Sequence, residues 1–153
     1  MRRRPRRRRG AAVLEMSIIL SVFLVLTFGM LDLGLGVFRY HVLAQAARHV
    51  ARRAIVHGEL ADRLGTWGPS TIEVTASGGG EPVVGAAGEG VQPMLIGCDL
   101  DQTHIRVEWL NGSNGFNDSV RATITSPYQP IMLFIFPNGA ITLTASSTMD
   151  VAH

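Results

Sequence analysis

The sequence predicts an α+β fold in which one long N-terminal helix packs on a small antiparallel β-sheet. Three observations carry this prediction. An apolar run follows a basic N-terminus, an alanine-rich segment with helical periodicity continues from that run, and short alternating segments bounded by Gly, Asn and Pro fill the rest of the chain. A chain of 153 residues has room for one small domain and one membrane segment.

The N-terminal segment is strongly basic. Seven of the 14 basic residues lie between Arg2 and Arg9, which leaves 7 basic against 12 acidic residues in the rest of the chain. This Arg run contains Pro5 and offers nothing to pack, so we expect residues 1–10 to form a solvated leader that Gly10 separates from the apolar run. Positive charge before an apolar span predicts a cytoplasmic N-terminus and an extracytoplasmic C-terminal domain.

Residues 11–38 are predicted to form a transmembrane helix. The only charged residues between positions 11 and 37 are Glu15 and Asp32. A helix needs about 20 residues at 1.5 Å rise to cross roughly 30 Å of hydrocarbon, and residues 17–38 supply them. The run is longer than the apolar part of a cleaved secretory signal, about 7–15 residues, and no small-x-small cleavage pattern follows it. Retention as a single-pass anchor is therefore favoured.

Residues 39–58 are predicted to continue the same helix outside the membrane, with one apolar face. Alanine, the best helix former, is dense here, and Gly58 is the predicted helix stop. The apolar stripe consists of Val42, Leu43, Ala46, Ala47, Val50 and Ala54. The polar residues that fall mainly on other faces are Arg39, Gln45, Arg48, Arg52 and Arg53.

Residues 59–153 are predicted to form an extracytoplasmic β-rich domain with three to four antiparallel strands on the outer part of the helix. The turn formers at 111–115 predict a hairpin between the second and third strands. The two prolines in 126–130 are expected to end the third strand. The expected strands are 71–75, 103–109, 119–125 and 140–149. Two connections are also expected: a Gly-rich loop at 78–90, and an apolar turn at 131–136 that packs on the domain or touches the membrane.

The junction between leader and span has an informative spacing. Gly10 ends the basic leader, and Glu15 comes five residues later within the start of the apolar run. This arrangement resembles the processing site of type IV prepilins and their relatives. The resemblance implies that a prepilin peptidase cuts after Gly10, so that Ala11 becomes the N-terminus and Glu15 the fifth residue. An acid is costly in lipid unless it is paired, and the N-terminal ammonium of an adjacent subunit would pair with Glu15.

A second resemblance rests on stretches spread from residue 8 to residue 149. Stretches at 8–15, 30–34, 44–52, 120–125, 127–130 and 141–149 are similar in order and spacing to TadE-like proteins. The resemblance implies a pilin-like fold and a minor pseudopilin of the tight-adherence (Flp) pilus, held in the inner membrane. Its partners would be a prepilin peptidase, other pilins and pseudopilins, the inner-membrane assembly platform and membrane lipid. Met16 departs from the family, which often has an aromatic residue directly after the Glu.

Asp32 matches an acid that is common at this point of the family. Two interpretations stay open for it: an intramembrane contact with another subunit, as for Glu15, or an acid that reaches the outer headgroup region. Cys98 is expected to be a small buried apolar residue, because the sequence places no base beside it.

Other classes of function are weakly supported. His41, His49 and His57 recur every eight residues, too far apart to share one metal, and are expected to be exposed. The acids and amides between positions 99 and 118 lack EF-hand spacing, and no nucleophile elbow is present. We therefore expect no catalytic residue, metal or cofactor, and the apolar span argues against nucleic-acid binding by the Arg run. The alternative function is an uncleaved, signal-anchored protein whose β domain binds a ligand or partner.

Overall fold

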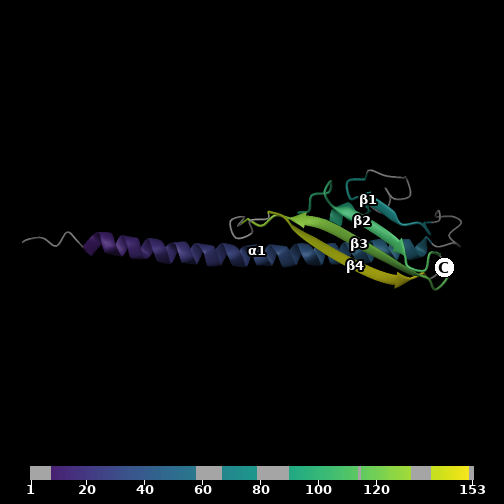
Figure 1. The fold of residues 1–153 in the computed structure, drawn as a ribbon, viewed down its shortest axis with the longest axis horizontal. Coiled ribbons are helices and arrows are strands. Elements are labelled where there is room, and N and C mark those ends of the chain that lie inside the picture. Colours follow the sequence, from purple (N-terminus) through teal and green to yellow (C-terminus); the bar gives the residue numbers. More distant parts are fainter. Residues whose placement is uncertain (1–7, 58–66, 79–89, 114, 132–138, 152–153) are drawn as a thin grey trace, which may run out of the picture.

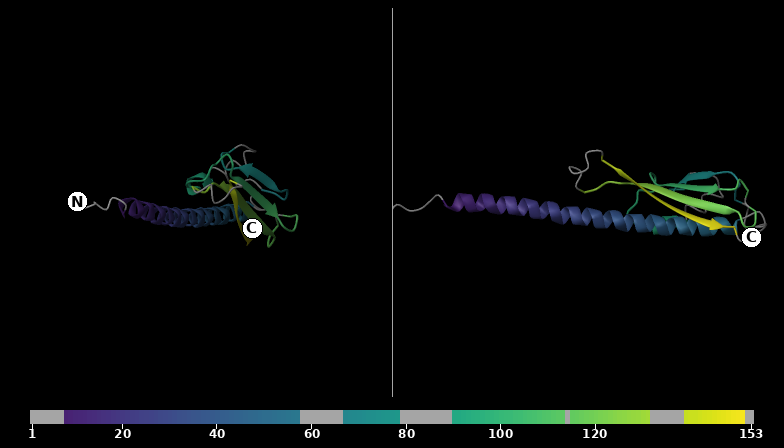
Figure 2. Two further views of the ribbon diagram at one scale, coloured as in Figure 1. Left: turned by 60° about the vertical axis from the view of Figure 1, so that its left-hand side comes forward. Right: turned by 60° about the horizontal axis from the view of Figure 1, so that its bottom comes forward.

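The computed structural model describes residues 8–57, 67–78, 90–113, 115–131 and 139–151. One long helix, α1 (Arg8–Val56, 49 residues), runs the length of the molecule. A four-stranded sheet packs along the C-terminal half of α1, and the N-terminal half projects beyond the sheet (Figures 1 and 2). This arrangement confirms the predicted α+β fold.

The sheet is antiparallel throughout and has the order β1-β2-β3-β4. Its strands are β1 (Ile72–Thr75), β2 (His104–Trp109), β3 (Ser119–Tyr128) and β4 (Ile141–Asp150), with a 3₁₀ turn, η1 (Gln92–Met94), before β2. The predicted hairpin is present, since β2 pairs with β3 in a register that places Val107 opposite Ala122. The expected strand positions are right to within one residue, except at the end of β3.

Small side chains on α1 let the sheet approach closely. Ala46, Ala47, Ala51 and Ala54 have no exposed surface, and Leu43 is equally buried. The predicted apolar stripe is confirmed, although Val42 is only half-buried and Ala51 joins the stripe without having been predicted. The strand residues that complete the core are Ile105, Val107, Trp109, Val120, Ala122, Ile124 and Ala145.

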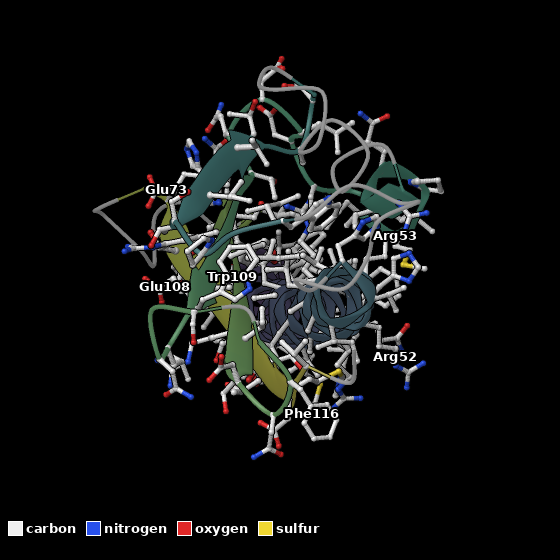
Figure 3. The ribbon with its side chains drawn as sticks, turned by 90° about the vertical axis from the view of Figure 1, so that its right-hand side faces the viewer. Arg52, Arg53, Glu73, Glu108, Trp109 and Phe116 are labelled. Carbon is white, nitrogen blue, oxygen red and sulfur yellow. The ribbon has the colours of Figure 1, made fainter. Side chains whose placement is uncertain are left out.

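The cross-section has two different outer faces. Figure 3 looks along α1 from its C-terminal end, with Trp109 between helix and sheet. Arg52 points away from the sheet on the far side of α1, and Glu73 and Glu108 lie on the outer face of the sheet. Both acids form ion pairs with Arg106, at 3.2 Å and 2.6 Å.

Strand β3 runs three residues beyond its predicted end. The prolines do not stop it after Thr125 as expected, because Pro127 pairs with Thr142 of β4. The pairing with β2 ends where His104 lies opposite Thr125, so in the described sheet β3 is an edge from there on. Proline lacks an N–H, and an edge is where a strand tolerates that loss.

The start of the helix also differs from the expectation. Gly10 does not break the leader from the helix, because α1 begins at Arg8 and includes Gly10. Glycine costs about 1 kcal/mol relative to alanine in a helix interior, and less is lost in the first turn, whose N–H groups have no intrahelical acceptor anyway. The predicted stop at Gly58, most of the loop at 78–90 and most of the turn at 131–136 lie outside the described residues.

Candidate functional site

The N-terminal half of α1 exposes its apolar side chains on every side. From Val13 to Leu31 the large hydrophobic side chains are 42–78% exposed. Ser17, Ser21 and Thr27 each donate a hydroxyl hydrogen bond of 2.8 Å to the carbonyl four residues earlier. The three hydroxyl groups of this stretch are thus satisfied within the helix, as a lipid environment requires. Within the described part of the chain, α1 is the one helix long and apolar enough to cross a membrane.

The predicted cleavage site lies at the exposed start of this helix. Gly10, Ala11, Glu15 and Met16 are all exposed, and nothing lies within 4 Å of the position that a Cβ would take at Gly10. The first turn of α1 contains no acidic residue that could interact favourably with the positive end of the helix dipole. Ala11 and Glu15 are four residues apart and therefore share one face of the helix.

Asp32 is held by the end of the sheet in its own chain. Its side chain is buried, with 6% of the residue exposed. The backbone N–H of Ile131 donates to Asp32 Oδ1 at 2.8 Å. The hydroxyl of Tyr128 donates to the Asp32 carbonyl oxygen at 3.0 Å and lies 3.4 Å from Oδ1. Neither interpretation of Asp32 from the sequence included this contact.

Tyr128 contacts three positions on one face of α1, namely Asp32, Gly36 and Arg39. A Cβ at Gly36 would lie 3.6 Å from Tyr128 Cε1, so the ring rests on the helix at a glycine. The Arg39 guanidinium stands 5.0 Å from the centre of the same ring, a cation–π contact. Burial, and then the charge of Asp32, raise the pKa of Tyr128 above its usual value, so its hydroxyl stays a donor. We call Asp32, Gly36, Arg39, Tyr128 and Ile131 the latch.

An apolar groove opens beside the latch, between α1 and the ends of β3 and β4. Its volume is about 660 Å³. From the helix it is lined by residues between Val25 and Tyr40, and from the sheet by Tyr128, Pro130, Ile141 and Leu143. The groove faces the exposed half of α1, so it continues the apolar surface of the helix onto the sheet.

The helix is the part of the chain that matches a known family. The model described as TadE-like protein matches residues 10–52. Residues 10–52 are therefore similar to TadE-like proteins. The match starts at Gly10 and contains the exposed span and Asp32, and it fits a membrane-anchored component of a tight-adherence (Tad) pilus. No curated protein and no solved structure matches the chain.

The TadE-like match ends within the amphipathic part of α1. The expected likeness of β3 and β4 to the family lies beyond residue 52 and stays a prediction. The subunit contacts expected for Glu15 and Asp32 also stay predictions, as does the residue at which the helix leaves the membrane.

The three histidines at positions 41, 49 and 57 have different surroundings. His41 is exposed and His49 is half-buried. His57 is also half-buried, because its ring stacks on Trp67 at 4.5 Å between centres and 7° between planes. The expectation of three exposed histidines is therefore wrong for His49 and His57. The described residues contain no group of three metal-ligating side chains.

Asp118 closes the turn between β2 and β3. Its carboxylate accepts hydrogen bonds from the Ser113 hydroxyl, from Asn111 Nδ2 at 2.9 Å and from the Gly115 N–H at 3.0 Å. The bonds from Ser113 and then Asn111 lower the pKa of Asp118. These contacts explain why acids and amides gather in this turn. Cys98, expected to be buried, is half-buried and packs against the core.

Proposed function

We propose that the chain is a minor pseudopilin, anchored in the inner membrane by its TadE-like helix, that takes part in assembly of a tight-adherence (Flp) pilus or a related secretion apparatus. One observation carries the proposal. The Gly10–Glu15 junction lies at the exposed start of an apolar helix, at the residue where the family match begins. The arginines before the span support a cytoplasmic N-terminus and an extracytoplasmic sheet.

The first step of this function is hydrolysis of the Gly10–Ala11 peptide bond by a prepilin peptidase. A peptidase binds an extended chain, so the first turn of α1 must unwind. That unwinding is inexpensive, because the first N–H groups of a helix lack intrahelical acceptors and glycine is a poor helix former. Gly10 also presents no side chain to the enzyme, and nothing in the described chain lies against it.

Cleavage creates the charge that Glu15 needs. The new ammonium of Ala11 lies one helical turn from the Glu15 carboxylate in the same subunit, and an adjacent subunit brings a second ammonium. A charged acid at the centre of a bilayer costs about 2.5–3.5 kcal/mol on insertion scales, and less near an interface. Pairing with an ammonium offsets this cost and sets the register between neighbouring subunits.

Most of the sheet then stands outside the membrane, where it contacts other pilins or pseudopilins and the assembly platform. The basic face of α1 opposite the sheet, with Arg48 and Arg52 exposed, is accessible to such partners. We assign no catalytic residue and no cofactor to the chain.

The proposal is tested by the intact mass of the full-length protein extracted from membranes. In cells with the peptidase the N-terminus is expected at Ala11, and in cells without it at Met1. A Gly10→Leu variant is expected to keep its leader, whereas Gly29→Ala, a glycine within the span, is the matched control and is cut normally. An intact leader in cells that contain the peptidase contradicts the proposal and favours the uncleaved, signal-anchored binding protein.

A further inference from the structure

We propose that the membrane-proximal end of the sheet is a second membrane contact, in which Ile131 and Ile141 enter the outer leaflet and a phospholipid acyl chain occupies the groove between α1 and the sheet. The inference rests on the membrane anchoring of α1 proposed above. It adds a lipid-binding surface on the β domain to that anchor.

The first argument is the depth of Asp32. A hydrocarbon layer of about 30 Å takes about 20 helical residues. A layer that begins at Ala12 ends near Leu31, beside Asp32. A layer that begins at Ser17 ends near Phe38, and Asp32 then lies about 9 Å inside, at 1.5 Å per residue. In both placements Asp32 lies at or below the outer boundary of the hydrocarbon.

The second argument is that the sheet shares this depth. The Ile131 N–H is 2.8 Å from Asp32 Oδ1, so Ile131 lies at the level of Asp32. The side chain of Ile131 is nonetheless 63% exposed, and that of Ile141, which pairs with Tyr128, is 38% exposed. Figures 1 and 2 show that β3 ends and β4 begins at the end of the sheet nearest the exposed half of α1. These two exposed isoleucines therefore lie where the acyl chains are.

The third argument is that the latch provides hydrogen-bond partners for the polar groups that would otherwise oppose insertion into hydrocarbon. An acid and a free backbone N–H are both costly in hydrocarbon. Here the Asp32 carboxylate accepts from Ile131, and the Tyr128 hydroxyl donates to Asp32. Arg39 and Tyr40 follow seven and eight residues after Asp32 on α1, and a basic and an aromatic side chain are typical of the interface above the hydrocarbon.

The occupant of the groove is inferred from the continuity of the groove with the span. The groove shares Val25, Leu26, Gly29, Met30 and Leu33 with the exposed helix, and Met30 and Leu33 are 78% and 70% exposed. A lipid that contacts the helix can therefore extend one chain between helix and sheet without leaving the bilayer. A groove volume of about 660 Å³ is ample for an acyl chain.

The test uses full-length single-cysteine variants in a Cys98→Ser background, spin-labelled and reconstituted into phosphatidylcholine–phosphatidylglycerol vesicles. Labels are placed at Ile131 and Ile141. The matched aqueous control is Phe116, which is 75% exposed at the far end of the domain. The membrane control is Phe23, which is 61% exposed within the span and does not line the groove. Because the latch uses the backbone of Ile131, Ile131→Cys leaves the bond to Asp32 in place.

The measured quantity is the ratio of collision rates with oxygen, which concentrates in lipid, and with a water-soluble nickel chelate. At Ile131 and Ile141 the ratio is expected to be several-fold higher than at Phe116 and close to that at Phe23. A ratio at Ile131 equal to that at Phe116 overturns the proposal, since the sheet then stands in water. Protection from both reagents at Ile141 also overturns the proposal, because protein then fills the groove. If that protein is a second copy of the chain, the spectrum of the label shows dipolar broadening. A low ratio at Phe23 contradicts the membrane anchor itself, a separate failure.

Discussion

Replacing Asp32 by alanine removes the acceptor of one defined hydrogen bond, that from the Ile131 N–H. A hydrogen bond to a charged group contributes about 1.5–3 kcal/mol, and the 3.4 Å contact from Tyr128 to the same oxygen adds little. The Tyr128 hydroxyl keeps its bond to the Asp32 carbonyl oxygen, so the sheet end stays near the helix. Opening at Ile131 therefore becomes easier by about 1.5–3 kcal/mol, which is roughly 10- to 150-fold in an equilibrium constant.

The assay is amide hydrogen exchange, followed by NMR on the full chain in lipid nanodiscs. Exchange at Ile131 is expected to accelerate by that factor in Asp32→Ala. Asp32→Asn keeps a carbonyl acceptor and loses only the charge, so its effect is smaller. The internal control is the Leu110 N–H, which donates to the Ser119 carbonyl at 2.9 Å near the far end of the sheet and is expected to exchange unchanged.

Two results refute this reasoning. Equal exchange at Ile131 in wild type and Asp32→Ala means that the carboxylate does not hold the sheet. Equal acceleration at Ile131 and Leu110 means that the substitution unfolds the domain as a whole, so the latch is not a local contact.

Three further predictions concern other parts of the chain. Gly68→Ala is expected to lower the free energy of unfolding by about 2–4 kcal/mol in thermal melts, because Gly68 has φ +87° and a Cβ would lie 2.5 Å from the Trp109 ring; an unchanged melting temperature contradicts this. Ser113→Ala is expected to raise the pKa of Asp118 in an NMR titration. Since the folded pKa of Asp118 is depressed, its contribution to stability is present above the unfolded pKa and is lost as pH falls through the folded value. In Ser113→Ala, less stability is lost over this pH range. An unshifted titration of Asp118 refutes the assignment. Met16→Phe is expected to speed leader removal, seen as a higher mature-to-precursor ratio in a pulse–chase experiment, and a slower conversion argues against the prepilin resemblance.

The helix and the strands were predictable because their signals are local. The stripe from Leu43 to Ala54 repeats with the helical period, and the strands alternate with a period of two. In the structure, buried residues continue at every second position of β3 through Ser126 to Tyr128. In the sequence, the apolar alternation stops at Ile124, because Ser126 is polar. The two prolines also predicted an end, because a strand tolerates proline only at an edge of the sheet. Whether β3 is an edge at that point depends on where β2 ends, which the sequence of β3 does not show.

The latch was not predictable from the sequence. Asp32 and Tyr128 are 96 positions apart, and the sequence around neither residue indicates that the two are in contact. An acid near the end of a span is equally compatible with water, headgroups or a partner subunit. The stacking of His57 on Trp67 was missed for the same reason, since it depends on how the chain returns after the helix. The helix start near Gly10, by contrast, was misplaced by less than one helical turn because helix ends are poorly specified by sequence.

The continuity of α1 has a mechanical consequence. A helix of 49 residues is about 73 Å long at 1.5 Å per residue, and the sheet grips it from Asp32 to its C-terminal end. Without a hinge between the two halves, a pull that draws the anchor outward by one turn, about 5.4 Å, lifts the whole outer domain by the same distance. With the topology proposed above, α1 transmits an axial displacement of its membrane-spanning half to the sheet without loss.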